Sequence, residues 1–261
     1  MIIGISGKQQ HGKDTVANII NYLFWMKGIK EEVPNWEEIY DTTILSGDSF
    51  IEWLENAEEG DGGWKIKKFA GKLKEIASLL TGVPLERWED NDFKNSLMPE
   101  QWNKWRYFDE VSGIKKYRYF NDYETAKRYY FYGNKEASNA SAPLDIEYVQ
   151  ITYRLFLQLL GTEAMREGLH VNTWVNALLS DFRPGEQWLI TDVRFPNEYN
   201  AVKEWEGLKV KVIRNVEDSG DKHASETSLE NFEFDYVIDN GGTLTDLVIN
   251  VEEFLKYYKL L

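Results

Sequence analysis

The first fifteen residues, MIIGISGKQQHGKDT, join a short apolar run to a glycine-rich stretch and then to an amphipathic pattern. Met1 to Ile5 is brief and β-branched, as a buried parallel strand would be. The apolar residues that follow recur at the spacing of one helix face: Val16, Ile19, Ile20, Leu23 and Phe24. Between the two segments lies Gly7-x-x-x-x-Gly12-Lys13. A strand, glycine loop and helix in this order predict a phosphate-binding loop, because loop amides and a helix N-terminus surround the anion.

The residue after the lysine departs from the usual form of this loop. Ser or Thr commonly stands there with its hydroxyl on Mg²⁺, whereas this chain has Asp14 and places the hydroxyl one residue later, at Thr15. The residues that we expect to bind the phosphates of ATP are Gly7, His11, Gly12, Lys13, Asp14 and Thr15. Asp14 has a second interpretation, because a negative charge in the first turn also complements the helix dipole.

Composition limits the alternatives. A chain of 261 residues, 43% of them hydrophobic, can bury one large α/β core or a core with a subdomain. The absence of cysteine excludes disulfides, zinc–thiolate sites and cysteine nucleophiles, and three histidines argue against a histidine-rich metal centre. No apolar run approaches the ~20 residues of a membrane span, and no cleavable leader is visible. We expect a cytoplasmic protein with no membrane partner.

The net charge of −14 is concentrated in one segment. Residues 31–61 hold eleven Asp and Glu and no Lys or Arg, which leaves about −3 for the remainder. An acidic block of this kind is usually a solvated surface or a mobile segment, and we infer no partner from it. The overall acidity argues against nucleic acid as a partner, because DNA and RNA backbones bind basic surfaces.

Strands and helices alternate behind the loop. Periodicity and capping signals predict helices at 13–26, 71–81, 149–160, 172–181 and 196–206, strands at 187–192, 208–213 and 235–239, and a last helix capped by Thr243. Gly28 is the predicted stop of the first helix. The alternation predicts the three-layer α/β/α fold of P-loop NTPases with a mainly parallel sheet. We expect one domain over 1–261, with a variable acidic segment at 31–63 and a Tyr-rich helical or irregular insertion at about 100–148.

Part of that insertion is basic and aromatic. Residues 104–135 hold eight Lys and Arg against four Asp and Glu, together with seven of the fifteen tyrosines. Basic residues among aromatics can bind single-stranded nucleic acid by stacking. A subdomain packed on the core, an oligomer interface such as a homodimer, and a cover over an acceptor nucleotide remain open beside it.

Four further stretches carry a family resemblance. They are WKIKKFAGKLK at 64–74 with Phe93-Lys94, LLGTEAMR at 159–166 with Trp174 after it, LITDVRFPNE at 189–198, and His223-Ala224-Ser225-Glu226 after the strand that ends in Val212-Ile213-Arg214. In this order behind a GKDT loop, the chain resembles the bacteriophage deoxynucleoside monophosphate kinases of the P-loop kinase superfamily. The likeness covers roughly 1–25, 64–98 and 150–250. The segments 31–61 and 100–148 carry no matching motif.

The resemblance implies transfer of the γ-phosphoryl group of ATP to a deoxynucleoside 5′-monophosphate, with Mg²⁺. It implies that Lys13, Arg166 and Arg194 are catalytic, and that the metal is held by Thr15 and Asp192. The substrate-binding residues would be Lys74, Arg166, Trp174, Asp192 and Arg194. A lid over the donor would carry Arg214, His223, Ser225 and Glu226. If the protein is viral, as its relatives would be, the compartment is the host cytoplasm.

Residue chemistry supports part of this assignment. Asp192 and Arg194 fall at the C-terminal end of a predicted strand, where open α/β sheets bind ligands. An Asp there can hold Mg²⁺ through water, and an Arg two residues on can clamp a phosphate by a bidentate contact. A structural ion pair of Arg194 with Asp192 or Glu198 is the alternative. Lys74 can equally be a plain surface lysine, and Trp174 can fill the core.

Other functions stay open on the sequence alone. A P-loop kinase can act on another acceptor, such as dephospho-coenzyme A, phosphomevalonate or a modified-base nucleotide. A nucleotide-binding module without transfer activity and an enzyme acting on nucleic acid are further classes. The linings of the acceptor pocket decide among the kinases, and the sequence does not expose them.

Overall fold

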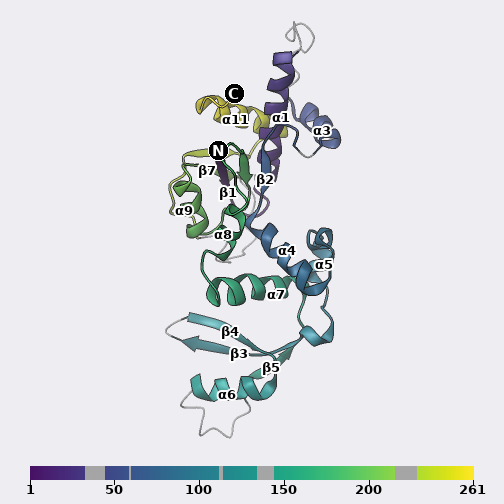
Figure 1. The fold of residues 1–261 in the computed structure, drawn as a ribbon, viewed down its shortest axis with the longest axis vertical. Helices are drawn as coiled ribbons and strands as arrows, with labels where there is room; N and C mark the ends of the chain where they lie inside the picture. The colour runs from purple at the N-terminus through teal and green to yellow at the C-terminus, as the bar shows by residue number, and fades with distance from the viewer. Residues whose placement is uncertain (33–44, 59, 112–113, 134–143, 215–227) are drawn as a thin grey trace. The chain divides into compact units, whose positions relative to one another are not determined.

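The structure is a computed structural model that describes residues 1–32, 45–58, 60–111, 114–133, 144–214 and 228–261. The chain divides into two compact units. The first comprises Met1–Lys72 and Leu169–Leu261, and the second is Leu73–Gly168 (Figure 1). The predicted insertion at about 100–148 falls inside the second unit, which begins earlier in the chain and ends later.

The first unit is built on a five-stranded sheet. Its strands are β1 (Ile2–Ser6), β2 (Lys65–Lys67), β6 (Trp188–Ile190), β7 (Leu208–Ile213) and β8 (Tyr236–Asp239). Their order is β2-β6-β1-β7-β8, and every neighbouring pair is parallel. The predicted α/β fold with a mainly parallel sheet is confirmed. Strand β1 lies at the centre, so the residues that follow β1 and β6 emerge at the same edge of the sheet.

Helices cover both faces of this sheet. Helices α1 (Lys13–Glu32), α3 (Gly47–Asn56) and α11 (Leu244–Tyr257) share one core with the sheet, to which β1 contributes Ile3 and Ile5. On the opposite face, α9 (Pro196–Glu204) packs on β1 and β7, with α8 (Thr173–Leu179) beside it. Gly4 points to this second face, where a Cβ would lie 2.8 Å from Val202. Successive residues of β1 therefore contact the helices on opposite faces of the sheet, as in a parallel strand that is buried on both faces.

Of two helix ends predicted in the first unit, one is wrong and one is confirmed. Helix α1 continues through Gly28 to Glu32, so the predicted stop at Gly28 is wrong. Gly28 is exposed, while Ile29 beyond it packs on the core, and this packing outweighs the ~1 kcal/mol cost of an internal glycine. The capping box predicted for the last helix is confirmed: the Thr243 hydroxyl accepts from the Asp246 amide, and the Asp246 carboxylate accepts from the Thr243 amide.

Part of the acidic segment is a packed helix rather than solvated chain. Helix α3 begins after Ser46, whose hydroxyl accepts a hydrogen bond from the Ser49 amide at 3.1 Å. Its buried Phe50 meets the Tyr22 ring edge-on, with ring centroids 5.8 Å apart. The acidic residues of α3 thus lie on a helix with one apolar face. Residues 33–44 and 59 of this segment lie outside the described residues.

The second unit has its own apolar core. Helix α4 (Phe69–Thr81) begins in the first unit and continues into the second. The unit adds α5 (Asn91–Asn95), α7 (Tyr153–Gln158) and a nine-residue π-helical segment, Leu159–Glu167, with 3₁₀ turns at Leu85–Trp88 and Glu100–Trp102. Trp88, which is fully buried, is the centre of a cluster that includes Ala77 of α4 and Phe156 of α7. The predicted helix at 149–160 is therefore shorter at its start and changes its hydrogen-bond pattern after Gln158.

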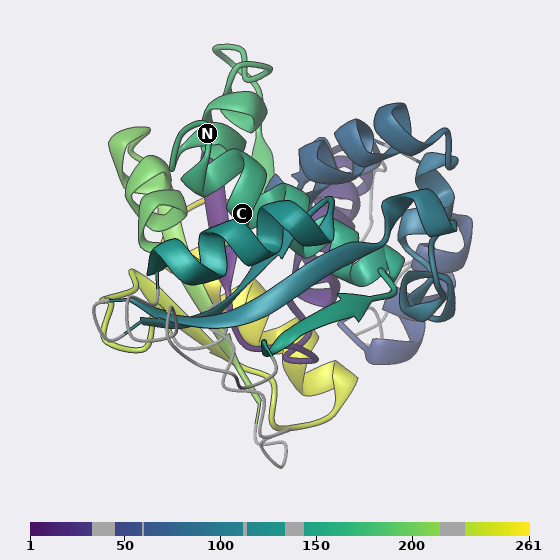
Figure 2. The same ribbon diagram turned by 90° about the horizontal axis from the view of Figure 1, so that it is seen from below.

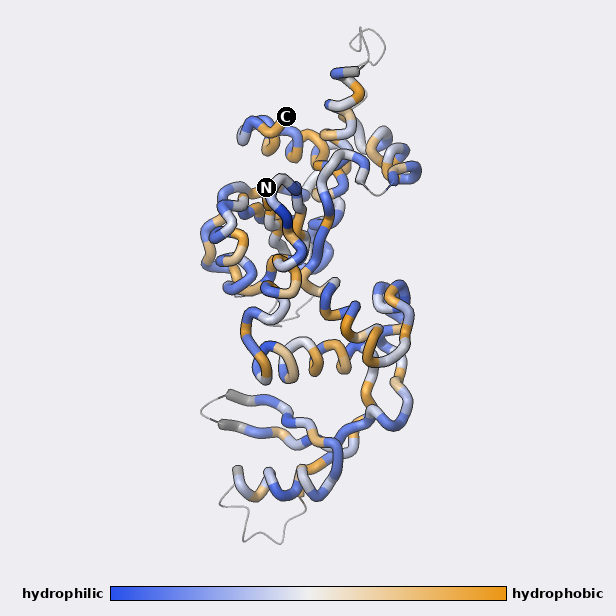
Figure 3. Tube along the Cα trace, viewed as in Figure 1, coloured by the Kyte–Doolittle hydropathy of each residue, from blue (hydrophilic) through white to orange (hydrophobic). Residues whose placement is uncertain are grey.

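The prediction of a helical or irregular insertion is wrong in part. Its helix is α6 (Tyr123–Gly133), and the rest includes an antiparallel sheet of β3 (Lys104–Val111), β4 (Ile114–Phe120) and β5 (Ile146–Val149) in the order β4-β3-β5. Helix α6 lies against this sheet (Figure 2), where Tyr107 of β3 contacts Phe120 and Tyr130. Cross-strand aromatic contacts favour a sheet here. Strands β3 and β4 are mainly hydrophilic in colour (Figure 3), which hid the alternation from a reading based on hydrophobic period.

Candidate functional site

The glycine loop leaves the end of β1 and enters α1 in a conformation that requires its two glycines. Gly7 has φ +153°, and a Cβ there would lie 2.6 Å from the Val212 carbonyl oxygen. Gly12 has φ +85°, in the left-handed region that favours glycine, and a Cβ there would lie 2.5 Å from the Asn240 amide nitrogen. The predicted strand, loop and helix are thus confirmed as structure. The loop is pressed against the ends of β7 and β8.

Buried polar contacts hold the loop in this shape. The His11 ring nitrogen Nδ1 lies 3.1 Å from the Val212 carbonyl oxygen, and the Asn240 side chain donates to the His11 carbonyl at 2.9 Å. The Lys13 ammonium donates to the carbonyls of Gly7 and Lys8, both at 2.7 Å. His11, Lys13 and Asn240 are all buried. The structure therefore brings the predicted loop residues together and adds Asn240, which we did not predict.

Asp14 connects the loop helix to two other segments. Its carboxylate accepts from the Thr191 hydroxyl at 2.6 Å and from the Lys68 ammonium at 2.9 Å. Burial acts to raise the pKa of the Asp14 carboxyl, but these two hydrogen bonds and the charges of Lys68 and Lys13 outweigh it and hold the pKa below its usual range. Asp14 is therefore ionised at neutral pH. It lies directly after Lys13, at the first turn of α1.

The oxygen atoms at the first turn of α1 suit a divalent cation. Mg²⁺ prefers oxygen ligands and usually keeps several waters, so one or two protein groups suffice. Thr15 and Asp14 offer a hydroxyl and a partly exposed carboxylate at the first turn of α1, and this donor set fits the ion. Within the described part of the chain, no group of three or more His, Cys, Asp or Glu side chains could hold a metal ion.

Asp192 follows β6 and contacts the first turn of α4. Its Oδ1 accepts from the Phe69 amide and its Oδ2 from the Ala70 amide, each at 2.8 Å. Burial raises the pKa of the Asp192 carboxyl, while the amide hydrogen bonds of Ala70 and Phe69 and the charge of Arg194 act in the opposite direction. Both oxygens of Asp192 thus already have donors, as both oxygens of Asp14 do. Asp14 is the more exposed of the two, so its carboxylate is better placed for a hydrated ion.

Arg194 lies two residues further on, ahead of α9. Its backbone amide donates to Glu198 Oε2 at 2.8 Å, and the Phe195 amide donates to the same oxygen at 3.1 Å. Glu198 is almost fully buried, so it fixes the backbone that carries Arg194 as part of the cap of α9. The strand ends that carry the loop and Arg194 are neighbours, because β1 pairs with β6 in register Gly4 to Ile190.

Two predicted residues lie in the second unit. Lys74 on α4 forms an ion pair with Glu89 at 2.6 Å. Arg166 lies in the π-helical segment, which packs into the same apolar cluster as α4 through Leu160 and Met165. The two cations are therefore carried by neighbouring elements of that unit. π-Helical backbone is rare in proteins, and where it interrupts an α-helix it is often found at a functional site. The Gly-Thr-Glu-x-x-Arg motif therefore lies on an unusual stretch of backbone.

The remaining predicted residues divide between the core, the surface and the undescribed part of the chain. Trp174 is part of α8 and is only 3% exposed, as its core interpretation requires. Arg214 is exposed directly after β7. His223, Ser225 and Glu226 lie outside the described residues.

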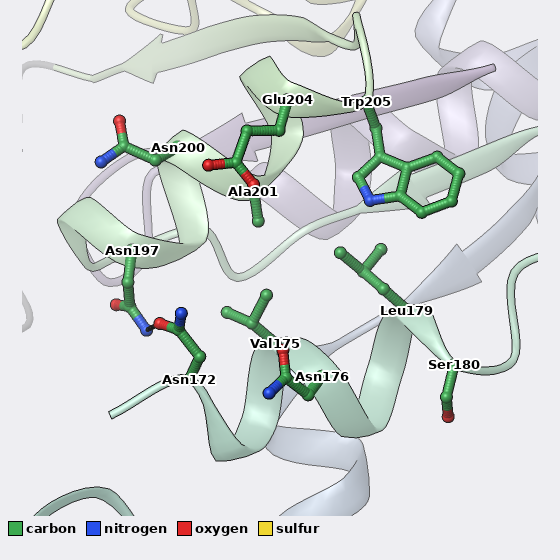
Figure 4. A pocket seen from close by; sticks show the side chains of 10 residues that line it. All are labelled: Asn172, Val175, Asn176, Leu179, Ser180, Asn197, Asn200, Ala201, Glu204 and Trp205. Carbon is green, nitrogen blue, oxygen red and sulfur yellow. Dashed lines mark hydrogen bonds between the residues drawn. The ribbon is translucent and has the colours of Figure 1, made fainter. Parts of the chain in front are cut away.

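A separate pocket lies between α8 and α9. It has a volume of about 450 Å³, and Figure 4 shows Val175 and Leu179 facing Ala201 and Trp205 across it. The Asn197 side chain donates to Asn172 Oδ1 and to the Val171 carbonyl, each at 3.1 Å, and joins the starts of the two helices. None of the predicted site residues lines it, and its lining holds no Lys or Arg. The pocket therefore does not have the chemistry of a phosphate site.

Three residues of the polar contacts were missed at the sequence level. Thr191 and Lys68 stand within stretches that carry the resemblance, but no motif there assigns a role to their side chains. Asn240 begins an Asn-Gly-Gly run that looks like a simple turn. Its contact with the loop joins residues 229 positions apart, and no local pattern reports such a contact.

Comparisons with known proteins agree with this geometry. A sequence profile of the family described as deoxynucleotide monophosphate kinase matches residues 83–251, which is more than half of the chain. The matched residues begin after the glycine loop and include Arg166, Asp192 and Arg194. The glycine loop therefore supports a kinase of this kind independently of the profile match. No helix within the described residues is long and apolar enough to cross a membrane.

Individual relatives come from viruses. The chain is 29% identical over 111 residues to the deoxynucleotide monophosphate kinase of Escherichia phage RB69, covering 40% of this chain and 44% of that protein. It is 28% identical over 112 residues to that of Enterobacteria phage T4, covering 41% and 46%. A protein of Acanthamoeba polyphaga mimivirus that carries the same family name is 31% identical over 116 residues, covering 39% and 60%. The matches thus span about half the length of these relatives.

The glycine loop, the Asp-x-Arg strand end beside it and the long profile match all indicate the same family. The chain belongs to the deoxynucleotide monophosphate kinase family.

Proposed function

We propose that this protein transfers the γ-phosphoryl group of ATP to a deoxynucleoside 5′-monophosphate, giving ADP and the diphosphate. Family membership supports the class of acceptor. The observation that carries the proposal is the locked glycine loop, with the buried Lys13 ammonium bonded over it, beside the strand end that carries Arg194. Phosphoryl transfer needs little covalent chemistry from the protein, and positioning with charge neutralisation supplies most of the rate.

The donor would bind at the loop. Amides of residues 7–15 and the N-terminus of α1 would surround the β- and γ-phosphates, and Lys13 would add a positive charge. Mg²⁺ would be held by Thr15 and Asp14, with any share for Asp192 made through water. When bound, the ion supplies neutralisation of charge on the transferred group.

Arginine would hold the acceptor. The Arg194 guanidinium can contact a phosphate through two parallel hydrogen bonds, a geometry that lysine does not reproduce. Arg166 and Lys74 are the further cations that we propose for the acceptor phosphate or the transition state. The cap formed by Glu198 fixes the backbone of Arg194, so the guanidinium starts from a defined position.

The proposal is tested by ADP formation from ATP and Mg²⁺ against a panel of deoxynucleotides, matching ribonucleotides, dephospho-coenzyme A and phosphomevalonate. We expect turnover on one or more deoxynucleotides. Lys13→Ala should lower kcat by about 10²–10³-fold with the fold intact, because a charge on the transferring phosphates is lost. Near-wild-type turnover in Lys13→Ala, or ATP binding with no turnover on any acceptor, contradicts the proposal.

Arg194→Ala tests the acceptor side separately. We expect kcat/KM for the deoxynucleotide to fall about 10–100-fold, as loss of a charge-assisted contact implies, with ATP binding unchanged. Arg183→Ala is the matched control, because Arg183 is an exposed arginine of the same unit that donates only to nearby carbonyls in the bonds described. An unchanged acceptor KM and kcat in Arg194→Ala would remove Arg194 from this role.

A further inference from the structure

The contacts of Asp14 and Asp192 close into one ring. Asp192 accepts from the amides of Phe69 and Ala70, and Asp14 accepts from Lys68 and Thr191. Lys68 directly precedes Phe69, and Thr191 directly precedes Asp192. Asp14 therefore binds the residue before Phe69 and the residue before Asp192, and this closes the ring. We call Asp14, Lys68, Thr191 and Asp192 the carboxylate brace.

The brace caps α4 from a distant part of the chain. The first amides of a helix have no partner inside the helix, and a carboxylate beside them also complements the helix dipole. Asp192 supplies this cap to a 13-residue helix across 122 to 123 positions of sequence. The start of α4 is thereby tied to the end of β6, in the first unit.

The other end of the ring is the phosphate loop. Asp14 follows Lys13 and lies in the first turn of α1, so phosphate bound at the loop would bring negative charge close to its carboxylate. The Mg²⁺ that Thr15 and Asp14 would hold brings a positive charge to the same carboxylate, and charges at short range act strongly where water is partly excluded. The hold of Asp14 on Lys68 and Thr191 is the part of the brace that such a charge would change.

We propose that the carboxylate brace is a positioning device that transmits nucleotide binding from the phosphate loop to the start of α4. Asp14 senses the occupied loop, and Thr191 and Lys68 pass the change to Asp192 and to the first turn of α4. The functional meaning of α4 as an acceptor-side helix rests on the proposed function, whereas the coupling itself does not. Asp192 acts here through α4, as a positioning residue.

Hydrogen exchange measured by mass spectrometry tests the coupling with ADP and Mg²⁺ as the probe. In the wild type, the probe should change the exchange rate of amides at 69–72 as well as protecting the loop at 7–16. Thr191→Val keeps the branched shape and removes the hydroxyl that Asp14 accepts from. We expect the response at 69–72 to fall at least about threefold in this variant while loop protection remains. Thr81→Val is the matched control, because the Thr81 hydroxyl bonds the Ala77 carbonyl at the far end of α4.

Asp192→Asn tests the cap itself. An amide can accept with only one of its two polar atoms, so exchange at 69–72 without ligand should speed up about five- to tenfold, the size of a lost helix cap. An unchanged exchange rate at 69–72 in Asp192→Asn, or a full response at 69–72 in Thr191→Val, would each overturn the proposal. Absence of phosphoryl transfer to deoxynucleotides would leave these readouts unaffected.

Discussion

At the scale of single residues, the shape of the loop depends on contacts from outside it. Asn240 fills the space that a side chain at position 12 would occupy, and its amide satisfies the carbonyl of His11. A buried carbonyl that loses its donor carries a desolvation penalty of about 1–3 kcal/mol. The loop amides that would bind phosphate are therefore held by a residue from the far end of the sheet.

Asn240→Ala should weaken nucleotide binding. We expect Kd for ADP to rise about tenfold, which corresponds to about 1.4 kcal/mol, because the carbonyl of His11 is left unpaired and Gly12 gains room to move. Asn250→Ala is the matched control, since Asn250 also donates its side-chain amide to a backbone carbonyl, that of Asp239. Isothermal calorimetry measures both variants. Equal affinities in Asn240→Ala and the wild type would refute the role of Asn240.

The ionisation of Asp14 gives a prediction in pH. Its pKa is lower in the folded protein than its ordinary 3.8, so the stabilisation from ionised Asp14 is present above that value and is lost as pH falls through the folded pKa. The wild type should therefore differ from Asp14→Asn by a constant amount above about pH 5 and converge toward it below pH 3.8. Urea unfolding at each pH measures the difference. A difference that grows as pH falls would contradict the assignment.

At the scale of elements, the sequence predicts best where the pattern is local. The glycine loop, the capping box at Thr243 and the period of α4 are each set by residues within one or two turns, and the structure confirms them. The hairpin of β3 and β4 was missed because both of its faces mix aromatic and charged residues: Tyr107 pairs across the strands with Arg118, and Arg106 pairs with Tyr119. A scale that counts tyrosine as polar finds no alternation there.

Long-range contacts explain the other differences between the predicted and the observed elements. Helix α1 passes Gly28 because the core supports Ile29, and α3 forms in acidic sequence because Phe50 reaches Tyr22. The predicted site residues were identified individually, but their connections were not. That Asp192 caps α4 follows only from the folded chain, since Phe69 and Asp192 are 123 positions apart.

At the scale of the whole molecule, each unit has an apolar cluster of its own. One joins α1, α3 and α11 to a face of the parallel sheet in the first unit, and the other includes Trp88 in the second unit. Each contributes different predicted groups, with Lys13 and Arg194 in the first unit and Lys74 and Arg166 in the second.

Trp88→Ala should destabilise the second unit. Trp88 is fully buried and contacts Phe93, Tyr153 and Phe156, so truncation should lower the free energy of unfolding of that unit by about 3–5 kcal/mol. Hydrogen exchange should accelerate within 73–168 and much less within the sheet of the first unit. Leu79→Ala is the control, because Leu79 is 86% exposed on α4. Uniform acceleration over both units would show that they unfold as one.

The central claim is that phosphate is transferred rather than released, and product stoichiometry tests it most directly. Purified protein is incubated with ATP, Mg²⁺ and the deoxynucleotide that gives the fastest ADP formation, and all nucleotides and free phosphate are quantified over time. The account predicts one deoxynucleoside diphosphate for every ADP, little free phosphate, and loss of both products in Lys13→Ala. ADP accompanied by free phosphate, with no deoxynucleoside diphosphate, would contradict it.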